Sequence, residues 1–345
     1  MKLQVYETAL TLTHRWATSR STASTAQVVV VALDDGSLRG WGEAAPIARY
    51  GESASSVRQF LQQVDVERLD SSDLEVSTRY IANLSPGQNA AKCALNVALF
   101  DAAAKRAGRA VYDYLQLGFR EGKHVTSFTI GIATPEVIRH KVNDARAYPI
   151  LKLKLGSARD RESFAAVREV APEKRVRVDA NEAWRTKEVA LDNIEWLARD
   201  GNVELIEQPM PAATPRADLA WLKRRSPLPL FADESCHDAL DVDACAEGFH
   251  GVNIKLAKTG GLSGALAALR AARSCGLQTM LGCMVESSIA ISAAAQLAEV
   301  CDHLDLDGNL LIVDDPYLGV SARAGALSFE TAPEPHGIRS RPRQG

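Results

Sequence analysis

Eight short apolar segments, separated by amphipathic ones, constrain the fold of this chain more than any other feature. They begin near residue 124, and the segments between them show helical spacing, as in residues 160–170, where Phe164, Val167 and Val170 recur. The predicted strands are residues 126–132, 150–155, 175–179, 203–207, 228–232, 251–256, 278–281 and 303–305. Strands that alternate with helices form a parallel sheet, and eight of them predict a (β/α)8-type barrel.

The first third of the chain follows a different pattern. Residues 3–13, 27–33 and 38–43 are predicted strands of a meander, residues 14–22 a polar loop, and residues 53–64 and 88–107 amphipathic helices. We therefore predict an α+β unit over residues 1–120 and a barrel over residues 121–316. Residues 317–345 have no barrel strand of their own, and we expect them to pack on the first unit and complete it.

Composition excludes several classes of partner. The 345 residues, 46% of them hydrophobic, can bury a large core. The 40 basic and 43 acidic residues are intermixed and give a net charge of −3, which argues against nucleic acids and anionic membranes as partners. The start is unlike a signal peptide, and no apolar run could span a bilayer. Six cysteines without a C-x-x-C pair indicate reduced thiols, so we expect a cytoplasmic protein.

Charged residues stand at the ends of five successive predicted strands. They are Lys154, Asp179, Glu207, Asp233 and Lys255, and the intervals between them are 25, 28, 26 and 22 residues. Each interval is about one strand–helix unit, so these side chains are expected to share one rim of the barrel. The carboxyl ends of barrel strands are where barrel enzymes place their active sites.

The second predicted barrel strand carries two lysines. Side chains alternate across a strand, so Lys152 and Lys154 point to the same side. Two ammonium groups on one inward face repel each other and lose hydration, and both effects lower a lysine pKa. A lysine that is partly neutral near pH 7 can accept a proton. The alternative is an edge strand with two solvated lysines.

The three carboxylates of Asp179, Glu207 and Asp233 are expected to converge. Unpaired, they would repel one another and raise one another's pKa. A hard divalent cation resolves the repulsion, and all-oxygen ligation suits Mg²⁺. Any one of these carboxylates alone would more simply form a salt bridge or cap a helix, but three in register favour a metal.

Lys154 and Lys255 lie four strands apart and should face each other across the barrel mouth. A metal ion with a lysine on either side suits removal of a proton α to a carboxylate. The metal stabilises the developing ene-diolate, and each lysine can serve one face of the carbon.

These motifs resemble the muconate-lactonizing subgroup of the enolase superfamily. The matching features are Lys152-x-Lys154, Asp179-x-Asn181, Glu207-Gln-Pro, Asp233-Glu, Lys255-x-x-Lys258-x-Gly-Gly and, in the first unit, Gly40-Trp-Gly-Glu43. The resemblance implies an α+β capping domain over a modified (β/α)7β barrel. It also implies that Asp179, Glu207 and Asp233 bind one Mg²⁺ per subunit, that Lys154 and Lys255 are the acid/base pair, and that Lys152 gives electrostatic support near the substrate carboxylate.

The Asp305-Leu-Asp307 sequence resembles the Asp-x-Asp motif of the dipeptide epimerases, whose two aspartates hold the substrate's α-ammonium group. Period-two spacing agrees, because it places both carboxylates on one side. The alternative is that Asp305 and Asp307 cap a turn before Gly308.

The substrate side-chain pocket is less well defined by sequence. Arg20 resembles the arginine with which Ala-Glu epimerases hold the glutamate carboxylate, and the planar fork of an arginine suits a carboxylate. Arg15, Trp16 and Arg49 lie in the same region, and Arg20 could instead be a solvated loop arginine. Val285 and Glu286 are predicted to line the side of the pocket formed by the seventh strand. The alternative for Glu286 is a position behind the lining residues, without substrate contact.

The resemblance implies a Mg²⁺-dependent dipeptide epimerase that inverts the α-carbon of the C-terminal residue by two-lysine 1,1-proton transfer. L-Ala-D/L-Glu is the first expected substrate, in murein peptide recycling, and a homo-oligomer is the expected assembly. The alternatives within the subgroup are a cycloisomerase, an o-succinylbenzoate synthase and an N-acylamino acid racemase. A non-catalytic small-molecule-binding barrel is the alternative from another class.

Overall fold

The computed structural model describes residues 1–18 and 22–344, without the side chains of residues 15–17. It opens with an antiparallel sheet of β1 (Lys2–Ala17), β2 (Thr22–Asp34) and β3 (Arg39–Ala44) in that order. The predicted meander is confirmed, but the predicted polar loop over residues 14–22 is too long. After a register shift, β1 and β2 continue to pair as far as Ala17 and Thr22. Strand pairing uses backbone groups, so it can extend through polar sequence.

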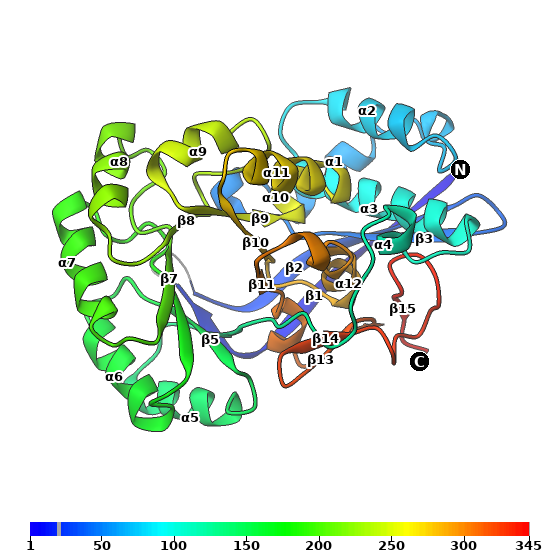
Figure 1. The fold of residues 1–345 in the computed structure, drawn as a ribbon. Coiled ribbons are helices and arrows are strands. Elements are labelled where there is room, and N and C mark those ends of the chain that lie inside the picture. Colours follow the sequence, from blue (N-terminus) through cyan, green and yellow to red (C-terminus); the bar gives the residue numbers. More distant parts are fainter. Residues whose placement is uncertain (19–21, 345) are drawn as a thin grey trace.

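Helices cover one side of this sheet (Figure 1). They are α1 (Ala54–Leu61), α2 (Leu74–Leu84), α3 (Asn89–Arg106) and the short α4 (Val111–Tyr114), with 3₁₀ turns η1 (Ala48–Tyr50) and η2 (Val66–Arg68). The long helix α3 packs directly on β3. A Cβ atom on Gly40 would lie 2.0 Å from the carbonyl oxygen of Ala98, and one on Gly42 would lie 1.9 Å from that of Ala94. The two glycines therefore allow helix and strand to approach this closely.

Eight parallel strands form the second part of the structure (Figure 1). They are β4 (Phe128–Ile130), β5 (Ile150–Lys154), β6 (Arg175–Asp179), β7 (Val203–Glu207), β8 (Leu230–Ala232), β9 (Gly251–Lys255), β10 (Gln278–Gly282) and β11 (His303–Asp305), each beside the next. A parallel bridge joins Thr126, two residues before β4, to Leu304 of β11, so the sheet is nearly closed. All eight predicted strands are confirmed, with ends that differ by at most a few residues.

Helices follow the first seven of these strands. They are α5 (Pro135–Asp144), α6 (Asp160–Val170), α7 (Lys187–Ala198), α8 (Arg216–Arg225), α9 (Val242–Gly248), α10 (Leu256–Thr259) with α11 (Leu262–Ser274), and α12 (Ser288–Ala295), which leads through the 3₁₀ turn η3 (Ala298–Val300) to the last strand. No α-helix follows β11 in the described part of the chain, and the 3₁₀ turn η4 (Gly308–Leu311) comes next. The barrel is therefore of the (β/α)7β type, as expected.

The C-terminal segment contains β12 (Tyr317–Leu318), β13 (Ser321–Arg323), β14 (Ala326–Ser328) and β15 (Arg341–Pro342). It returns toward the first part of the chain: the backbone N–H of Ile338 donates to the α3 carboxylate of Asp101 at 2.8 Å, and Gly337 bridges with Ala110. In Figure 1 this red segment lies near β3 and α4. The exact domain boundaries at residues 120/121 and 316/317 stay a prediction.

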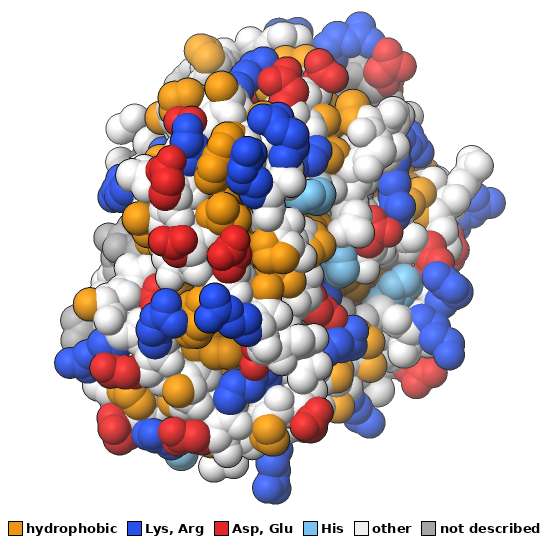
Figure 2. Space-filling model, turned by 60° about the vertical axis from the view of Figure 1, so that its left-hand side comes forward, with side chains coloured by type: hydrophobic (Ala, Val, Ile, Leu, Met, Phe, Trp, Pro, Cys, Tyr) orange, Lys and Arg blue, Asp and Glu red, His pale blue; other side chains and the backbone are white. Residues whose placement is uncertain are grey.

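The outer face of the barrel helices carries both signs of charge. The side that bears α6, α7 and α8 comes forward in Figure 2, where Lys and Arg are interspersed with Asp and Glu. A membrane-crossing helix would need a long apolar stretch, and none of the helices in residues 1–18 and 22–344 has one.

Candidate active site

The predicted charged residues meet at the carboxyl-terminal rim of the barrel. Lys154, Asp179, Glu207 and Lys255 are each the last residue of their strand, and Asp233 directly follows β8. Strand register accounts for the convergence, because Lys154 pairs with Asp179, and Asp179 pairs with Glu207. All five side chains are buried.

The three carboxylates form a compact oxygen cluster. One carboxylate oxygen from each of Asp179, Glu207 and Asp233 lies within 4.8 Å of the others. Burial first, and then the neighbouring Asp179 carboxylate, raise the pKa of Glu207 to about 8. A buried all-oxygen cluster whose negative charges oppose one another is the donor set that Mg²⁺ prefers.

The contacts of Glu207 test whether the three carboxylates fit a divalent cation. Its Oε1 atom accepts a hydrogen bond from Asn253 Nδ2 at 2.9 Å. Its buried Oε2 atom lies 2.7 Å from the ammonium of Lys152, but within the described part of the chain it receives no aligned hydrogen bond. A carboxylate oxygen that accepts no aligned hydrogen bond has a lone pair available for a metal ion. The residues present therefore fit a divalent cation.

Lys154 and Lys255 flank the carboxylates on opposite sides of the barrel. Lys154 Nζ donates to Asp179 Oδ2 at 2.5 Å, and Lys255 Nζ donates to Asp233 Oδ2 at 2.9 Å. Burial by itself would lower the pKa of Lys255, but the Asp233 and Glu207 carboxylates together outweigh it and hold that pKa above its usual range. The two ammonium groups thus approach the same cluster from β5 and β9.

Lys152 does not behave electrostatically as the sequence suggested. Its Nζ atom lies 2.6 Å from Asp305 Oδ2, 2.7 Å from Glu207 Oε2 and 3.3 Å from Asp179 Oδ2. Burial would lower its pKa, but these carboxylates raise it well above the usual range. The expected lowering is therefore wrong for Lys152. The prediction weighed the neighbouring lysine, whereas three other strands, β6, β7 and β11, bring carboxylates within ion-pair distance across the barrel.

Lys258 was part of the sequence motif but had no assigned role. Its Nζ atom donates to Asp233 Oδ1 at 2.7 Å and to the backbone oxygens of Asp233, Cys236 and Asn253 at 2.6, 2.8 and 2.9 Å. These contacts hold the Asp233 side chain in place from behind. Asn253 was missed as well, although its position two residues before Lys255 on a barrel strand places both side chains on one side.

A cavity of about 550 Å³ opens over this rim. Its lining includes the predicted residues Lys152, Lys154, Asp233, Lys255, Val285, Asp305 and Asp307. Leu12, Ile47 and Tyr50 line it from the β1–β3 sheet and the turn after it, so both parts of the fold build the wall. Glu286 does not appear among the lining residues described. It is buried, and its Oε2 atom accepts from the backbone N–H of Met284 at 3.3 Å.

The two aspartates of the Asp-x-Asp sequence share this cavity wall. Asp305 accepts from Lys152 Nζ at 2.6 Å and from Ser127 Oγ at 2.7 Å, and Asp307 Oδ2 accepts from the backbone N–H of Thr129 at 2.6 Å. The Asp307 side chain forms no capping hydrogen bond with η4, which disfavours the alternative of a turn cap. Burial and then the Asp305 carboxylate raise the pKa of Asp307 to about 7.

The predicted arginine cannot be placed. Arg20 lies outside the described residues, so its assignment stays a prediction. Arg49, from the same region of sequence, lines the cavity and forms a two-pronged ion pair with Glu182, with Nε–Oε2 and Nη2–Oε1 distances of 3.1 and 3.0 Å. Glu182 follows β6 in the left-handed backbone region, with φ of 68°. The pair joins the turn after β3 to the barrel rim.

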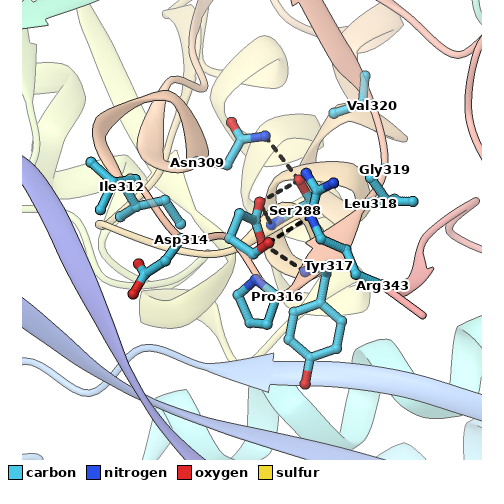
Figure 3. Close-up of a pocket in the computed structure, with 12 residues that line it drawn as sticks. Ser288, Asn309, Ile312, Asp314, Pro316, Tyr317, Leu318, Gly319, Val320 and Arg343 are labelled. Carbon is cyan, nitrogen blue, oxygen red and sulfur yellow. Dashed lines mark hydrogen bonds between the residues drawn. The ribbon is translucent and has the colours of Figure 1, made fainter. Parts of the chain in front are cut away.

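A second hollow, of about 680 Å³, lies between α12 and the C-terminal segment (Figure 3). Ser288, Asn309, Tyr317 and Arg343 are among its lining residues. The polar groups there are largely bonded to one another, as with Ser288, which donates to Asp315 Oδ2 through N at 3.0 Å and Oγ at 2.6 Å. None of the five strand-end charged residues lines this hollow. The larger hollow is therefore not the candidate active site.

Known proteins resemble this chain along nearly its whole length. It is 55% identical to the L-Ala-D/L-amino acid epimerase of Pedosphaera parvula, covering 99% of each chain. It is 39% identical to the L-Ala-D/L-Glu epimerase of Bacteroides thetaiotaomicron, covering 96% of this chain and 86% of the relative. Among solved structures, the dipeptide epimerase of Enterococcus faecalis with Mg and L-Leu-L-Tyr superimposes with a TM-score of 0.90 at 28% identity, covering 98% of each chain.

Two family descriptions match separate parts of the sequence. Residues 2–116 match the N-terminal domain of mandelate racemase/muconate lactonizing enzyme, and residues 137–330 match the enolase C-terminal domain-like family. The matched regions contain the β1–β3 sheet with its helices and nearly all of the barrel. The chain therefore belongs to the mandelate racemase/muconate lactonizing enzyme family of the enolase superfamily.

Proposed function

We propose that this protein is a Mg²⁺-dependent dipeptide epimerase that inverts the α-carbon of the C-terminal residue. The observation that carries the proposal is the placement of Lys154 and Lys255 on opposite sides of one carboxylate cluster. Inversion requires a proton to leave one face of a carbon and return to the other, and two lysines on opposite sides provide a base and an acid for these faces. The relatives named as epimerases support the same activity.

Asp179, Glu207 and Asp233 would hold the Mg²⁺ ion. When bound, the ion supplies positive charge that stabilises the negative charge developing on the substrate carboxylate. Lys258 would keep Asp233 oriented through its bonds to both the side chain and the backbone of that residue. Lys152, buried beside Glu207 and Asp305, would add fixed positive charge near the substrate carboxylate.

One lysine of the pair accepts the α-proton and the other donates a proton to the opposite face. A neutral lysine is needed for the first step. The carboxylate contacts favour the charged form of Lys255, and binding of a divalent cation by Asp233 would weaken that effect, because the carboxylate charge is then shared. Asp305 and Asp307 would hold the α-ammonium group of the dipeptide at the cavity wall.

L-Ala-L-Glu is the first substrate to test, because the relative from Bacteroides thetaiotaomicron is named an L-Ala-D/L-Glu epimerase. Arg20 and Val285 are the proposed side-chain contacts, with Glu286 behind Val285. A role in murein peptide recycling, a cytoplasmic location and a homo-oligomeric assembly belong to the same proposal. The six free cysteines agree with a reducing compartment.

The test is a screen of L,L-dipeptides, including L-Ala-L-Glu, in D₂O with Mg²⁺ and detection by mass. We expect deuterium at the α-carbon of the C-terminal residue together with formation of the L,D-epimer. Absence of deuterium from every dipeptide would refute the assignment. Undiminished turnover by an Asp305→Ala/Asp307→Ala variant would favour another reaction of the subgroup, since an ammonium group would then not be held there.

A further inference from the structure

A five-residue loop forms part of the cavity wall. Residues 283–287, called the 283–287 loop below, connect β10 to α12. Cys283, Met284 and Val285 line the cavity, whereas Glu286 and Ser287 are buried behind them. The position of this loop therefore decides the shape of the cavity near Lys255, which is the last residue of the neighbouring strand β9.

The end of this loop is bonded to a residue from the first part of the chain. Glu43, next to last in β3, accepts a hydrogen bond from the backbone N–H of Ser287 on its Oε1 atom at 2.9 Å. The hydroxyl of Ser287 donates to Glu43 Oε2. Ser287 is also the N-cap of α12, since its Oγ atom accepts from the backbone N–H of Ile289 at 3.2 Å. Glu43 thus accepts from both hydrogen-bond donors of the residue at which the loop ends.

Other contacts restrict the two ends of the loop but come from the barrel and the segment after it. Asp315 accepts from Ser288, which lies on the hollow shown in Figure 3. A Cβ atom on Gly308 would lie 2.3 Å from the carbonyl oxygen of Met284, so the chain after β11 packs closely against the loop. Met284 and Val285 also pack on an apolar cluster that includes Leu12 and Ala45, but the Glu43 contact differs because it ties the loop to β3 by hydrogen bonds.

A buried carboxyl group is costly unless its polar atoms are bonded. Glu43 is only 2% exposed, and both of its oxygens contact Ser287. Burial first, and then the Glu286 carboxylate, raise the pKa of Glu43 to about 8. A glutamine could keep both contacts: its Oε1 accepts from the Ser287 N–H, and its amide donates to Ser287 Oγ, which reverses the direction of the bond that Ser287 donates to Glu43 Oε2. An alanine could make neither.

We propose that Glu43 is a positioning residue that anchors the 283–287 loop to the first sheet and so determines how well the cavity fits its substrate. It acts through Ser287 and touches none of the reacting groups. The kinetic part of this inference rests on the proposed epimerase function, whereas the loop anchoring itself does not.

The test compares Glu43→Ala and Glu43→Gln with a matched control, Asp101→Ala. Asp101 is also a buried carboxylate outside the barrel strands and also accepts two hydrogen bonds, from the backbone N–H groups of Trp41 and Ile338, each at 2.8 Å. It contacts the C-terminal segment rather than the 283–287 loop. Each full-length variant is measured in two ways: amide hydrogen exchange of peptides covering residues 283–289, and steady-state kinetics with L-Ala-L-Glu and Mg²⁺.

Glu43→Ala is expected to speed amide exchange over residues 283–289 by about tenfold or more. In the wild type the loop can open only if the Glu43–Ser287 hydrogen bonds break, and in the variant this cost is absent. Glu43→Ala should raise KM by about tenfold and leave kcat within about threefold, because substrate fit is lost while both lysines stay in place. Glu43→Gln should stay within about twofold of the wild type in exchange and kinetics. Asp101→Ala should lower the melting temperature without changing exchange in this segment.

Wild-type exchange and KM in Glu43→Ala would overturn the inference, and so would an equal change in Asp101→Ala, which would indicate a global effect. If Glu43→Ala does not fold, Ser287→Ala removes the hydroxyl from the same contact, and unchanged exchange over residues 283–286 in that variant would overturn the anchoring. If the wild type converts no dipeptide, the proposed function fails, and the exchange measurement still decides the role of Glu43.

Discussion

Each lysine of the proposed acid/base pair sits beside one carboxylate of the cluster, with Lys154 against Asp179 and Lys255 against Asp233. This arrangement keeps positive charge next to the cluster on two sides. The Asp233 and Glu207 carboxylates favour the charged form of Lys255, so a cation bound by Asp233 would weaken that effect.

Replacing either lysine should remove one half of the proton transfer. We expect Lys154→Ala and Lys255→Ala each to lower the rate of epimerisation by about 10²–10⁴-fold, the usual contribution of general acid–base catalysis. Mg²⁺ affinity, measured by calorimetry, should be retained, because the three carboxylates remain. Full epimerisation by either variant would contradict a two-base mechanism.

Glu43 should also affect how stability depends on pH. The group has a pKa of about 8 when folded and an ordinary value of 4.5, with Glu286 and Asp315 as the acidic neighbours that add to the effect of burial. Between these values the unfolded chain binds fewer protons than the folded protein at this position, so the free energy of unfolding falls as pH rises. Below pH 4.5 both states are protonated and the effect disappears.

The Glu43→Gln variant isolates this contribution, since glutamine does not titrate. Between pH 5.5 and 8.5 the free energy of unfolding of the wild type should fall by up to about 3 kcal/mol more than that of the variant. The estimate takes about 1.36 kcal/mol for each pH unit between the two pKa values. Urea unfolding at both pH values measures the difference. Equal losses in the two proteins would mean that Glu43 titrates normally in the folded state.

At the level of secondary-structure elements, the contact of β3 with α3 limits what the first part of the fold tolerates. A methyl group on Gly42 would meet the α3 backbone at 1.9 Å, whereas one on Gly36, in the β2–β3 turn, would meet no atom within 4 Å. Backbone atoms in the middle of a packed helix cannot move aside as a flexible side chain could. The two glycines therefore serve different purposes.

A matched pair of substitutions separates these purposes. Gly42→Ala should destabilise the protein by about 3 kcal/mol or more, since helix and strand must separate. Gly36→Ala should cost only about 1–2 kcal/mol, from the left-handed backbone at φ of 92°. Urea unfolding of both variants tests the ranking, and a larger cost for Gly36→Ala would contradict this account of the β3–α3 contact.

At the level of the whole molecule, the proposed metal site draws on three neighbouring barrel strands or strand ends. The cavity above it is walled by both parts of the fold, with Arg49 and Glu182 as an ion pair between them. A ligand of the site therefore binds only the folded arrangement, and it should stabilise the protein as a whole.

Mg²⁺ should raise the melting temperature in proportion to the logarithm of its concentration once the site is saturated, and chelation should abolish epimerisation reversibly. Glu207→Gln should weaken the apparent Mg²⁺ affinity by at least about tenfold, since even supporting residues of metal sites contribute that much. Thermal denaturation across a Mg²⁺ series measures both effects. A wild-type melting temperature that does not change with Mg²⁺ concentration would argue against the metal site.

The amino-acid sequence by itself determined the barrel, the strand ends and the identity of the charged cluster. Period-two and helical spacing reflect which residues must be buried, and burial patterns are local enough to read along a chain. The intervals between Lys154, Asp179, Glu207, Asp233 and Lys255 equal the strand–helix repeat, so their convergence also followed from sequence. In a parallel sheet in register, residues at equivalent strand ends must lie at the same rim.

Only the tertiary structure decided the electrostatics and the contacts between distant segments. The pKa of Lys152 is raised rather than lowered, because its ammonium group forms ion pairs with Asp305 and Glu207. These two residues are 153 and 55 positions away from it in the sequence. The bond between Glu43 and Ser287 joins residues 244 positions apart, and no local pattern in either segment predicts it. Coulomb and hydrogen-bond energies depend on distances of a few ångströms, which the packing of the whole chain sets.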